Sequence, residues 1–358
     1  MGSRLLKTIK TQRFPSEVGV LKAPIDRLIN IKNGKCSATM VKIAVAGGTG
    51  NVATNMLKAA IASGNHEITI FTRSAPSTPH PSPKVSYKQV DYTDRAALTA
   101  ALQGIHTLLS FFVAHLDTDN TAQKNLLHAA LAAGVTRFAP SEWGIASYNG
   151  VPSYENKDAF RAYIEDLDAK NALGSLQICL FQPSIFMDYL AHPFPLEKDL
   201  ITWTFFLDFQ NRKAMILDDG DQPIVLTAIQ DDAKILAKAL DDTERPWPRI
   251  GGIRGCRTSI NELVALGKKI RGGDWHVEYV KSEDLQKGVL TSSWIPQLSH
   301  PAIPEEVRES FSKEFLMVFF EAIRRGSWNV SGEWNERFPE YAFLSVEEYL
   351  RRAWEGRP

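Results

Sequence analysis

From Met40 onward, short apolar runs alternate with longer segments whose apolar residues recur every three or four positions. The runs that predict β-strands are 41–46, 67–72, 85–90, 107–112 and 136–140. The segments that predict the first helices are about 50–63, 94–103 and 119–133. The run at 107–112 is apolar almost throughout, as in a parallel strand that is buried on both faces. This alternation predicts an α/β fold with a Rossmann-type doubly wound parallel sheet.

The turn after the first strand carries the strongest chemical signal. Its sequence has the pattern Gly-x-x-Gly-x-x-Ala, placed between the strand and the helix. Glycine at 47 permits a tight turn, glycine at 50 lets backbone N–H groups approach a diphosphate, and alanine at 53 lets the helix pack closely. Glycine turns also occur without ligands, but these flanking elements favour a dinucleotide site. The candidate binding residues are Gly47, Gly48, Thr49, Gly50, Asn51 and Val52.

Arg73 directly follows the second strand. Proteins selective for NAD usually place Asp or Glu near this point, where the carboxylate binds the ribose 2′-hydroxyl. A guanidinium instead suits a 2′-phosphate, because it forms paired charge-assisted hydrogen bonds, so NADPH is favoured over NADH. The alternative is a solvated loop arginine. Phe111, at the end of the fourth strand, is expected beside the centre of the cofactor.

Charge and cysteine usage exclude several classes of protein. The 41 basic and 41 acidic side chains give zero formal net charge, so no overall field favours nucleic acid. Three widely spaced cysteines indicate neither a zinc site nor a disulfide framework, which fits a reducing, cytoplasmic compartment. No H-E-x-x-H motif indicates a metal, and no run of about eighteen apolar residues predicts a membrane span.

Three parts of the chain are expected. Residues 1–39 carry eight basic and two acidic side chains, and we interpret them as a poorly ordered extension, with a mitochondrial presequence as the less favoured alternative. A dinucleotide-binding domain is expected at 40–185, its sheet completed by later segments at about 215–260, and a mainly substrate-binding, smaller C-terminal lobe at 186–354. Aromatic residues gather in this lobe and on a helix expected at about 305–325. Such stripes are more often core than pocket, but apolar walls also suit an aromatic substrate.

One longer motif follows the third predicted helix. Residues 133–144 read AGVTRFAPSEWG, which resembles the AGVKRFxPSEFG segment of the isoflavone reductase-like group within the NmrA-like atypical short-chain dehydrogenases. The resemblance covers about 40–354. Further segments similar to family motifs are 157–165, 186–190, 219–221 with 231–233, 259–263, 326–329 and 345–350.

The resemblance implies roles for a few polar residues. Ordinary short-chain dehydrogenases use Tyr-x-x-x-Lys, but no tyrosine in this chain has a lysine four residues later. The resemblance instead makes Lys157 the proton donor or the group that polarises the substrate oxygen, with Tyr154 as a candidate auxiliary acid. The alternative for Lys157 is a surface lysine at a helix start, which is an unfavourable place for a cation. Ser141 either binds cofactor or substrate or caps the next segment, and Glu142 is expected to pair with a cation.

The implied activity is an NADPH-dependent reductase that delivers hydride to a carbonyl, enone or benzylic centre of a small aromatic secondary metabolite. The alternative is a non-catalytic regulator that senses NAD(P) and binds a partner protein.

Two departures from the family pattern lie beside the expected substrate pocket. The connection 141–157 is shorter than in the plant reductases, and Asp188 replaces the glycine of the family's FxGYF segment. The substrate of the plant enzymes therefore cannot be carried over, and a monomer or homodimer is expected.

Overall fold

The computed structural model describes residues 39–74, 76–113, 116–300 and 303–358. The extension expected at 1–39 lies outside these residues, except for its last position. The described part of the chain falls within one compact unit, 38–358.

Six parallel strands form the central sheet, in the order β3-β2-β1-β4-β5-β6. The strands are β1 (Lys42–Ala46), β2 (Glu67–Thr72), β3 (Val85–Gln89), β4 (Thr107–Ser110), β5 (Arg137–Ala139) and β6 (Gln177–Ile178). The chain starts in the middle of the sheet and builds outward first to one side and then to the other. This order confirms the predicted Rossmann-type doubly wound fold.

After β6, the chain forms a separate two-stranded sheet with a segment from much later in the sequence. β6 and β7 (Leu180–Gln182) are separated only by Cys179, whose backbone N–H donates to the carbonyl oxygen of Phe138 at 3.1 Å. β7 then pairs in parallel with β12 (Ile250–Gly252). The strand β12 lies within the range 215–260 and pairs with β7, not with a strand of the six-stranded sheet.

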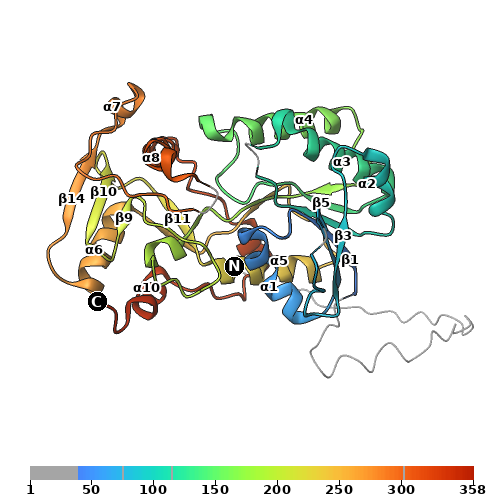
Figure 1. Ribbon diagram of the computed structural model, residues 1–358, viewed down its shortest axis with the longest axis horizontal. Helices are drawn as coiled ribbons and strands as arrows, with labels where there is room; N and C mark the ends of the chain where they lie inside the picture. The colour runs from blue at the N-terminus through green and yellow to red at the C-terminus, as the bar shows by residue number, and fades with distance from the viewer. Residues whose placement is uncertain (1–38, 75, 114–115, 301–302) are drawn as a thin grey trace, which may run out of the picture. The chain divides into compact units, whose positions relative to one another are not determined.

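Helices cover both faces of the sheet (Figure 1). One face carries α1 (Asn51–Ser63) and α5 (Ile229–Asp241), which pack against each other. The other carries α2 (Arg95–Ala101), α3 (Thr121–Ala133) and α4 (Glu155–Ala169). Alternation along β1 serves both layers, because Ile43 and Val45 belong to the core under α1 while Ala44 and Ala46 belong to the core under α3.

Several helices begin where the sequence supplies an N-cap. Asp94 caps α2, since its carboxylate accepts from the N–H of Ala97 at 2.9 Å. Ser259 and Glu262 form a capping box at the start of α6 (Ile260–Arg271). Ser345 caps α10 (Val346–Trp354) through the N–H of Glu348. These caps explain why the later family-like motifs coincide with helix starts.

Arg137, buried on β5, connects the sheet to the end of α5. Its guanidinium donates to the main-chain oxygens of Asp242 and Arg245, both at 2.7 Å, and stacks on the Trp247 ring at 5.1 Å. The carbonyls after a helix have no partner within it, so a buried arginine satisfies them here. The side chain therefore links two segments that are about a hundred residues apart.

The rest of the chain adds two small sheets and further helices. The sheets have the orders β14-β10-β9 and β13-β11-β8. Their strands are β8 (Ile185–Phe186), β9 (Leu207–Asp208), β10 (Lys213–Leu217), β11 (Ile224–Thr227), β13 (Cys256–Thr258) and β14 (His276–Val280). The remaining helices are α7 (Ser282–Gln286), α8 (Arg308–Arg324) and α9 (Glu333–Arg337), with 3₁₀ turns η4 (Thr118–Asn120), η5 (Pro152–Tyr154), η6 (Met187–Ala191) and η7 (Glu305–Val307).

Most of the late aromatic residues form a core, as the helical spacing favoured. Phe206, Phe209, Phe319 and Phe320 are buried, whereas Phe311 on the same helix as the last two is 40% exposed.

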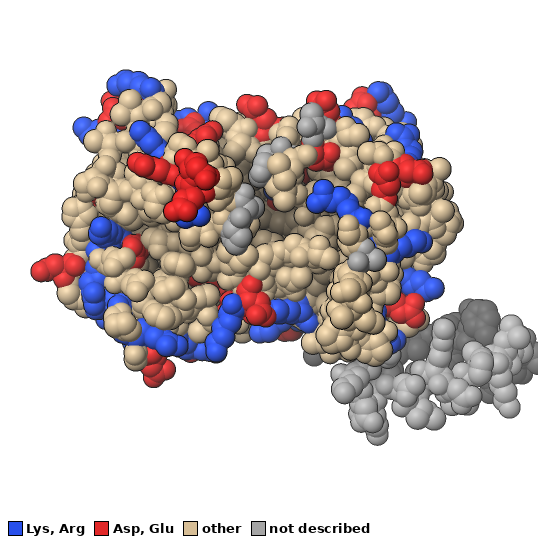
Figure 2. Space-filling view, in the orientation of Figure 1, with Lys and Arg blue, Asp and Glu red and all other residues tan. Residues whose placement is uncertain are grey.

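No helix in the described residues is long and apolar enough to cross a membrane. Within the same residues, no group of three or more His, Cys, Asp or Glu side chains could hold a metal ion. Figure 2 shows basic and acidic side chains interspersed over the described part of one face.

Candidate functional site

The glycine-rich turn joins β1 to α1 at the carboxyl edge of the sheet. Gly47 has a φ of 70°, and a Cβ atom there would lie 2.8 Å from the carbonyl oxygen of Phe111. A Cβ at Gly48 would lie 2.9 Å from the Val45 side chain. Both positions therefore require glycine, one for backbone conformation and close approach and the other for close approach.

The N-terminus of α1 has no anion of the protein's own. Its N-cap is Gly50, which makes no side-chain hydrogen bond, and its first turn contains no acidic residue. The first N–H groups of a helix lack partners within it and carry the positive end of the helix dipole. This end of α1 therefore fits a phosphate group.

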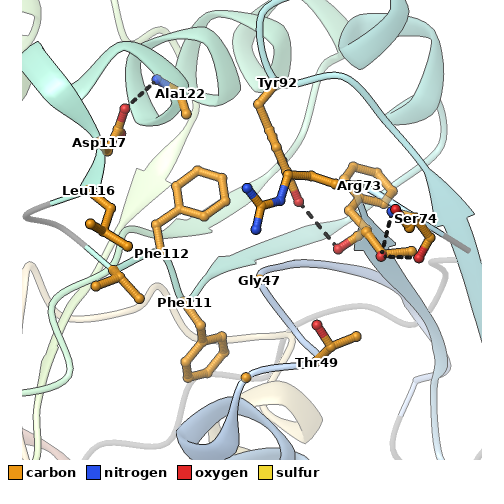
Figure 3. Close-up of a pocket in the computed structure, with 14 residues that line it drawn as sticks. Gly47, Thr49, Arg73, Ser74, Tyr92, Phe111, Phe112, Leu116, Asp117 and Ala122 are labelled. Carbon is orange, nitrogen blue, oxygen red and sulfur yellow. Dashed lines mark hydrogen bonds between the residues drawn. The ribbon is translucent and has the colours of Figure 1, made fainter. Parts of the chain in front are cut away.

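A cavity of about 470 Å³ opens beside this turn (Figure 3). Its walls come from the carboxyl ends of β1, β2 and β4 and from the segment before α3. The lining residues are Gly47, Thr49, Gly50, Phe71, Thr72, Arg73, Ser74, Tyr92, Phe111, Phe112, Val113, Leu116, Asp117 and Ala122. Of the predicted cofactor residues, Gly47, Thr49, Gly50, Arg73 and Phe111 thus share one cavity, whereas Gly48, Asn51, Val52 and Ser141 do not line it.

Arg73 extends from the end of β2 into this cavity, near Tyr92 (Figure 3). No ion pair joins its guanidinium to a carboxylate of the described residues. Its backbone is fixed, since Gln89 donates to the Arg73 carbonyl oxygen at 3.0 Å. A cation that lines a cavity and lacks an acidic partner fits a phosphate group of a ligand.

Phe111 is held by a stack of aromatic rings. Its ring lies 4.2 Å from that of Trp143, centroid to centroid and nearly parallel, and Trp143 stacks in turn on Phe181 at 5.2 Å. The Trp143 indole also donates to the carbonyl oxygen of Ser110 at 2.7 Å. Trp143 belongs to the family-like segment after β5, so this segment fixes the wall of the cavity at the end of β4.

Ser141 supports the same wall from behind. Its hydroxyl donates to the carbonyl oxygen of Phe112 at 2.6 Å, and its N–H donates to the Gln123 side chain at 2.9 Å. The side chain is buried and commits its proton to the protein. These bonds position the loop after β4. They are neither a ligand contact nor a cap of the next segment, the two roles expected for Ser141.

Asn51 and Val52 also face away from the cavity. The Asn51 carboxamide donates to the carbonyl oxygen of Asp199 at 2.7 Å and accepts from the N–H of Ile201 at 2.8 Å. Val52 packs against the core under α1. Their predicted cofactor contacts are therefore limited to their backbone groups.

Lys157 lies in the first turn of α4, and its neighbour Tyr154 is the N-cap of that helix. The Lys157 ammonium group donates to the carbonyl oxygen of Glu142 and lies 5.1 Å from the centre of the Tyr154 ring. Burial lowers the pKa of Lys157 to about 8, against a smaller opposing effect of Glu142 and with a further lowering by Arg161. Burial, aided by Glu142, raises the pKa of Tyr154 to about 12. Near neutral pH the lysine thus holds a proton that it can release, whereas the tyrosine keeps its own.

Glu142 pairs with a cation, as expected, and that cation is Arg161. Both side chains are buried, and Arg161 also pairs with Asp158 one turn earlier on α4. Sequence reasoning did not assign Arg161, although its spacing of four from Lys157 places both on one face of the helix. The pair fixes the segment that carries the oxygen bonded to Lys157.

Aromatic rings from the second part of the chain gather around Tyr189. Burial raises the pKa of Tyr189, on η6, and the charges of Asp188 and Tyr154 add to that shift, which makes Tyr154 and Tyr189 electrostatic neighbours. The Tyr189 ring packs on Trp203 at 4.7 Å and on Phe205 at 5.5 Å. We refer to Tyr189, Trp203 and Phe205 as the aromatic wall.

Asp188, which stands where the family motif has glycine, is fully buried behind this wall. Its carboxylate accepts from the N–H of Ile229 at 3.0 Å and from the Tyr349 hydroxyl at 2.8 Å. Burial nevertheless raises its pKa to about 6. The residue therefore joins η6 to α5 and α10.

Comparisons with known proteins place this chain among reductase relatives. A sequence model of the NmrA-like family matches residues 39–350. Oxidoreductase swnN of Metarhizium robertsii is 27% identical, over 88% of this chain and 98% of the relative. Phenylcoumaran benzylic ether reductase Betv6 of Betula pendula is 25% identical, over 87% of this chain and 98% of the relative.

Solved structures share the fold at lower identity. The ternary complex of leucoanthocyanidin reductase from Vitis vinifera has a TM-score of 0.60 and 20% identity, covering 87% of this chain and 98% of the other. An isoflavone reductase structure has a TM-score of 0.62 and 18% identity, covering 88% and 99%.

Proposed function

Because this chain belongs to the NmrA-like family, we propose that it is an NADPH-dependent reductase acting on a carbonyl, enone or benzylic centre of a small aromatic secondary metabolite. Relatives named as an oxidoreductase and as a benzylic ether reductase support the reaction class. The glycine-rich turn, the uncapped start of α1 and Arg73 support the cofactor. Each is a feature of this chain's own residues.

The cofactor would be held by the cavity beside β1. Backbone N–H groups at the start of α1 would bind its diphosphate, and the guanidinium of Arg73 would bind the 2′-phosphate. Phe111, held by Trp143, would limit the cavity at its inner end. When bound, the reduced nicotinamide supplies the hydride.

Lys157 is the observation that carries the proposal of catalysis. Its ammonium group is partly buried and has a pKa of about 8, so it is protonated near neutral pH yet gives up a proton more readily than an exposed lysine. The bond to the Glu142 carbonyl fixes the amine, and the Tyr154 ring supports it from one side. In this reading Lys157 Nζ donates a proton to the substrate oxygen as negative charge develops there.

The aromatic wall supports the substrate class. Tyr189 packs on Trp203 and Phe205 and interacts electrostatically with Tyr154, whose ring centre lies 5.1 Å from the Lys157 ammonium group. Planar aromatic substrates bind such surfaces by stacking and by apolar burial. Polar contacts then need to be made only at the reacting oxygen.

Cofactor binding and turnover test the two parts of the proposal separately. NADPH and NADH are titrated by nucleotide fluorescence, and turnover is measured on a panel of aromatic ketones, enones and benzylic ethers. The proposal expects tighter binding of NADPH and turnover that depends on Lys157. Tight NADPH binding without turnover of any acceptor would instead favour the NAD(P)-sensing regulator, and absence of binding would exclude both.

A further inference from the structure

A loop of the second part of the chain is bonded directly to the first turns of α1. The Asn51 carboxamide forms two hydrogen bonds with the backbone of Asp199 and Ile201, at 2.7 and 2.8 Å. Two turns further along α1, the Lys58 ammonium group pairs with Glu197 at 2.5 Å and Asp199 at 2.6 Å. We refer to residues 197–201 as the bridging loop.

The two attachments differ in kind. Lys58 is 39% and Asp199 is 75% exposed, so solvent and salt screen their ion pair. The Asn51 carboxamide binds backbone groups on both sides of Leu200, a residue that is 3% exposed. Asn51 therefore fixes the path of the loop, whereas Lys58 only adds to its attachment.

The bridging loop is also held at its other end. The N–H of Leu196 donates to the Tyr349 hydroxyl at 3.0 Å, and that hydroxyl donates to Asp188 at 2.8 Å. Asp188 directly precedes Tyr189 of the aromatic wall. The loop thus lies between α1 on one side and the buried support of η6 on the other.

The loop continues into the aromatic wall itself. Two residues after Ile201 comes Trp203, whose ring packs on Tyr189 at 4.7 Å. Between Ile201 and Trp203, the Thr202 hydroxyl lies 3.1 Å from Nδ1 of His192, which directly follows η6. A shift of the bridging loop would therefore move Trp203 relative to Tyr189.

We propose that Asn51 is a positioning residue that transmits cofactor binding at the start of α1 to the aromatic wall of the substrate site. Asn51 is the first residue of α1 and follows Gly50, which lines the cavity. Its N–H is one of the first of the helix, which have no partner within it, while its side chain holds the bridging loop. The inference rests on the proposed function, because it requires a dinucleotide in that cavity.

The physical basis is that one residue serves two sites. A diphosphate bound to the N–H groups of Gly50, Asn51 and Val52 restrains the first turn of α1, and with it the direction of the Asn51 carboxamide. Restraint of that carboxamide lowers the freedom of the bridging loop and of Trp203 behind it. Cofactor binding then prepares the wall before the substrate arrives, which is coupling between two sites.

Hydrogen exchange on the full chain, with NADP⁺ as the probe, tests this inference. Exchange of residues 194–206 is compared with and without saturating NADP⁺, whose binding is measured in parallel by calorimetry. We expect NADP⁺ to slow exchange of this segment at least about fivefold in the wild type. Asn51→Ala keeps the backbone N–H that the diphosphate would bind and removes only the carboxamide. At an NADP⁺ concentration that calorimetry shows to saturate this variant, it should abolish the slowing.

Lys58→Ala is the matched variant, because it removes an attachment of the same loop two turns further along α1, by a residue that does not line the cavity beside Gly47. It should raise exchange in both states and keep the NADP⁺-dependent difference. A purely structural role of Asn51 would instead make the two variants behave alike. Lys170→Ala, which removes an exposed pair with Asp166 on α4, should match the wild type.

Two results overturn the inference while leaving the proposed function intact: bound NADP⁺ without slower exchange at 194–206 in the wild type, or full slowing retained in Asn51→Ala. A calorimetric titration that shows no NADP⁺ binding to the wild type overturns the proposed function and this inference together.

Discussion

The side chain of Lys157 donates a hydrogen bond to the main-chain carbonyl oxygen of Glu142, so the amine of one family-like motif is fixed by the backbone of another. A neutral carbonyl orients the ammonium group without removing its proton. Burial lowers the pKa of Lys157 to about 8, which keeps the proton available near neutral pH. The first prediction follows from this arrangement.

Replacing Lys157 by Met should lower kcat at least about a hundredfold, because positioned acid catalysis typically contributes that much. NADPH affinity should stay within about twofold, since Lys157 does not line the cofactor cavity. In the wild type, kcat/KM for reduction should fall as pH rises through about 8, because the donor loses its proton there. Steady-state kinetics over pH check both points, with Lys170→Ala as control. Full activity in Lys157→Met would refute the assignment.

Replacing Arg73 by Ala should weaken NADPH binding about 10- to 100-fold and leave NADH binding nearly unchanged. A hydrogen bond to a charged group contributes about 1.5–3 kcal/mol, and only NADPH carries the 2′-phosphate that Arg73 would contact. Nucleotide fluorescence titrations measure both affinities. Arg73→Lys, which keeps the charge but loses the planar fork, should fall between wild type and Arg73→Ala. Equal losses for both nucleotides would mean that Arg73 does not recognise the phosphate.

Replacing Glu142 by Gln should lower the free energy of unfolding by about 3–5 kcal/mol, because Arg161 would be left buried without its main partner. Arg161→Met should have a comparable effect. The double variant should be less destabilised than the sum of the two, since it removes both charges. Urea denaturation of the wild type, the two single variants and the double variant completes a double-mutant cycle. Strict additivity of the changes in unfolding free energy would show that the two side chains do not interact.

Asp188 should make the protein less stable as pH rises from about 4 to 6. Burial raises its pKa from 3.8 to about 6, although the N–H of Ile229 and the Tyr349 hydroxyl act in the opposite direction. In that window the folded state binds more protons than the unfolded state, so the free energy of unfolding falls, by at most about 3 kcal/mol, and then levels off. The buried Asp232, whose pKa is also raised by burial and by Asp231 and Asp188, acts with the same sign.

Urea denaturation of Asp188→Asn tests this directly. The variant should match the wild type near pH 4 and be more stable near pH 7, with a flatter profile between. Asp166→Asn, an exposed control, should change the free energy of unfolding by less than about 0.5 kcal/mol at either pH. A profile of Asp188→Asn that runs parallel to the wild type would show that Asp188 does not titrate in this window.

The spacing of apolar residues was sufficient to predict most strands and helices in the first half of the fold. The second strand, predicted at 67–72, is Glu67–Thr72, and the first helix, predicted at about 50–63, is Asn51–Ser63. The helix predicted at 119–133 begins instead at Thr121, because Asp119 and Asn120 have positive φ values. Local pattern is reliable here because β1, β4 and β5 are buried on both faces, and the segments after β1, α1 and β3 carry Gly, Asp or Asn.

The part of the candidate site that the sequence did not predict consists of contacts between segments that are distant in the chain. The bond from Asn51 to Asp199 spans 148 residues and that from Glu142 to Arg161 spans 19, and neither leaves a periodic trace in the sequence. The glycine motif indicated that Asn51 lies at the phosphate site, but only the packing of the second part of the chain shows where its side chain is used. The stacking of Phe111 on Trp143 was inaccessible for the same reason.

The pairing of β7 with β12, together with the bonds from Arg137 to Asp242 and Arg245, means that the two halves of this chain are not separable modules. A chimera that grafts the second half of a reductase relative onto residues 1–185 would replace the strand beside β7 and the main-chain acceptors of the buried Arg137 guanidinium with segments that have not been matched to them. Exchange of substrate preference between such relatives is therefore expected to require changes of individual side chains on a shared scaffold, and engineering of this protein should follow the same route.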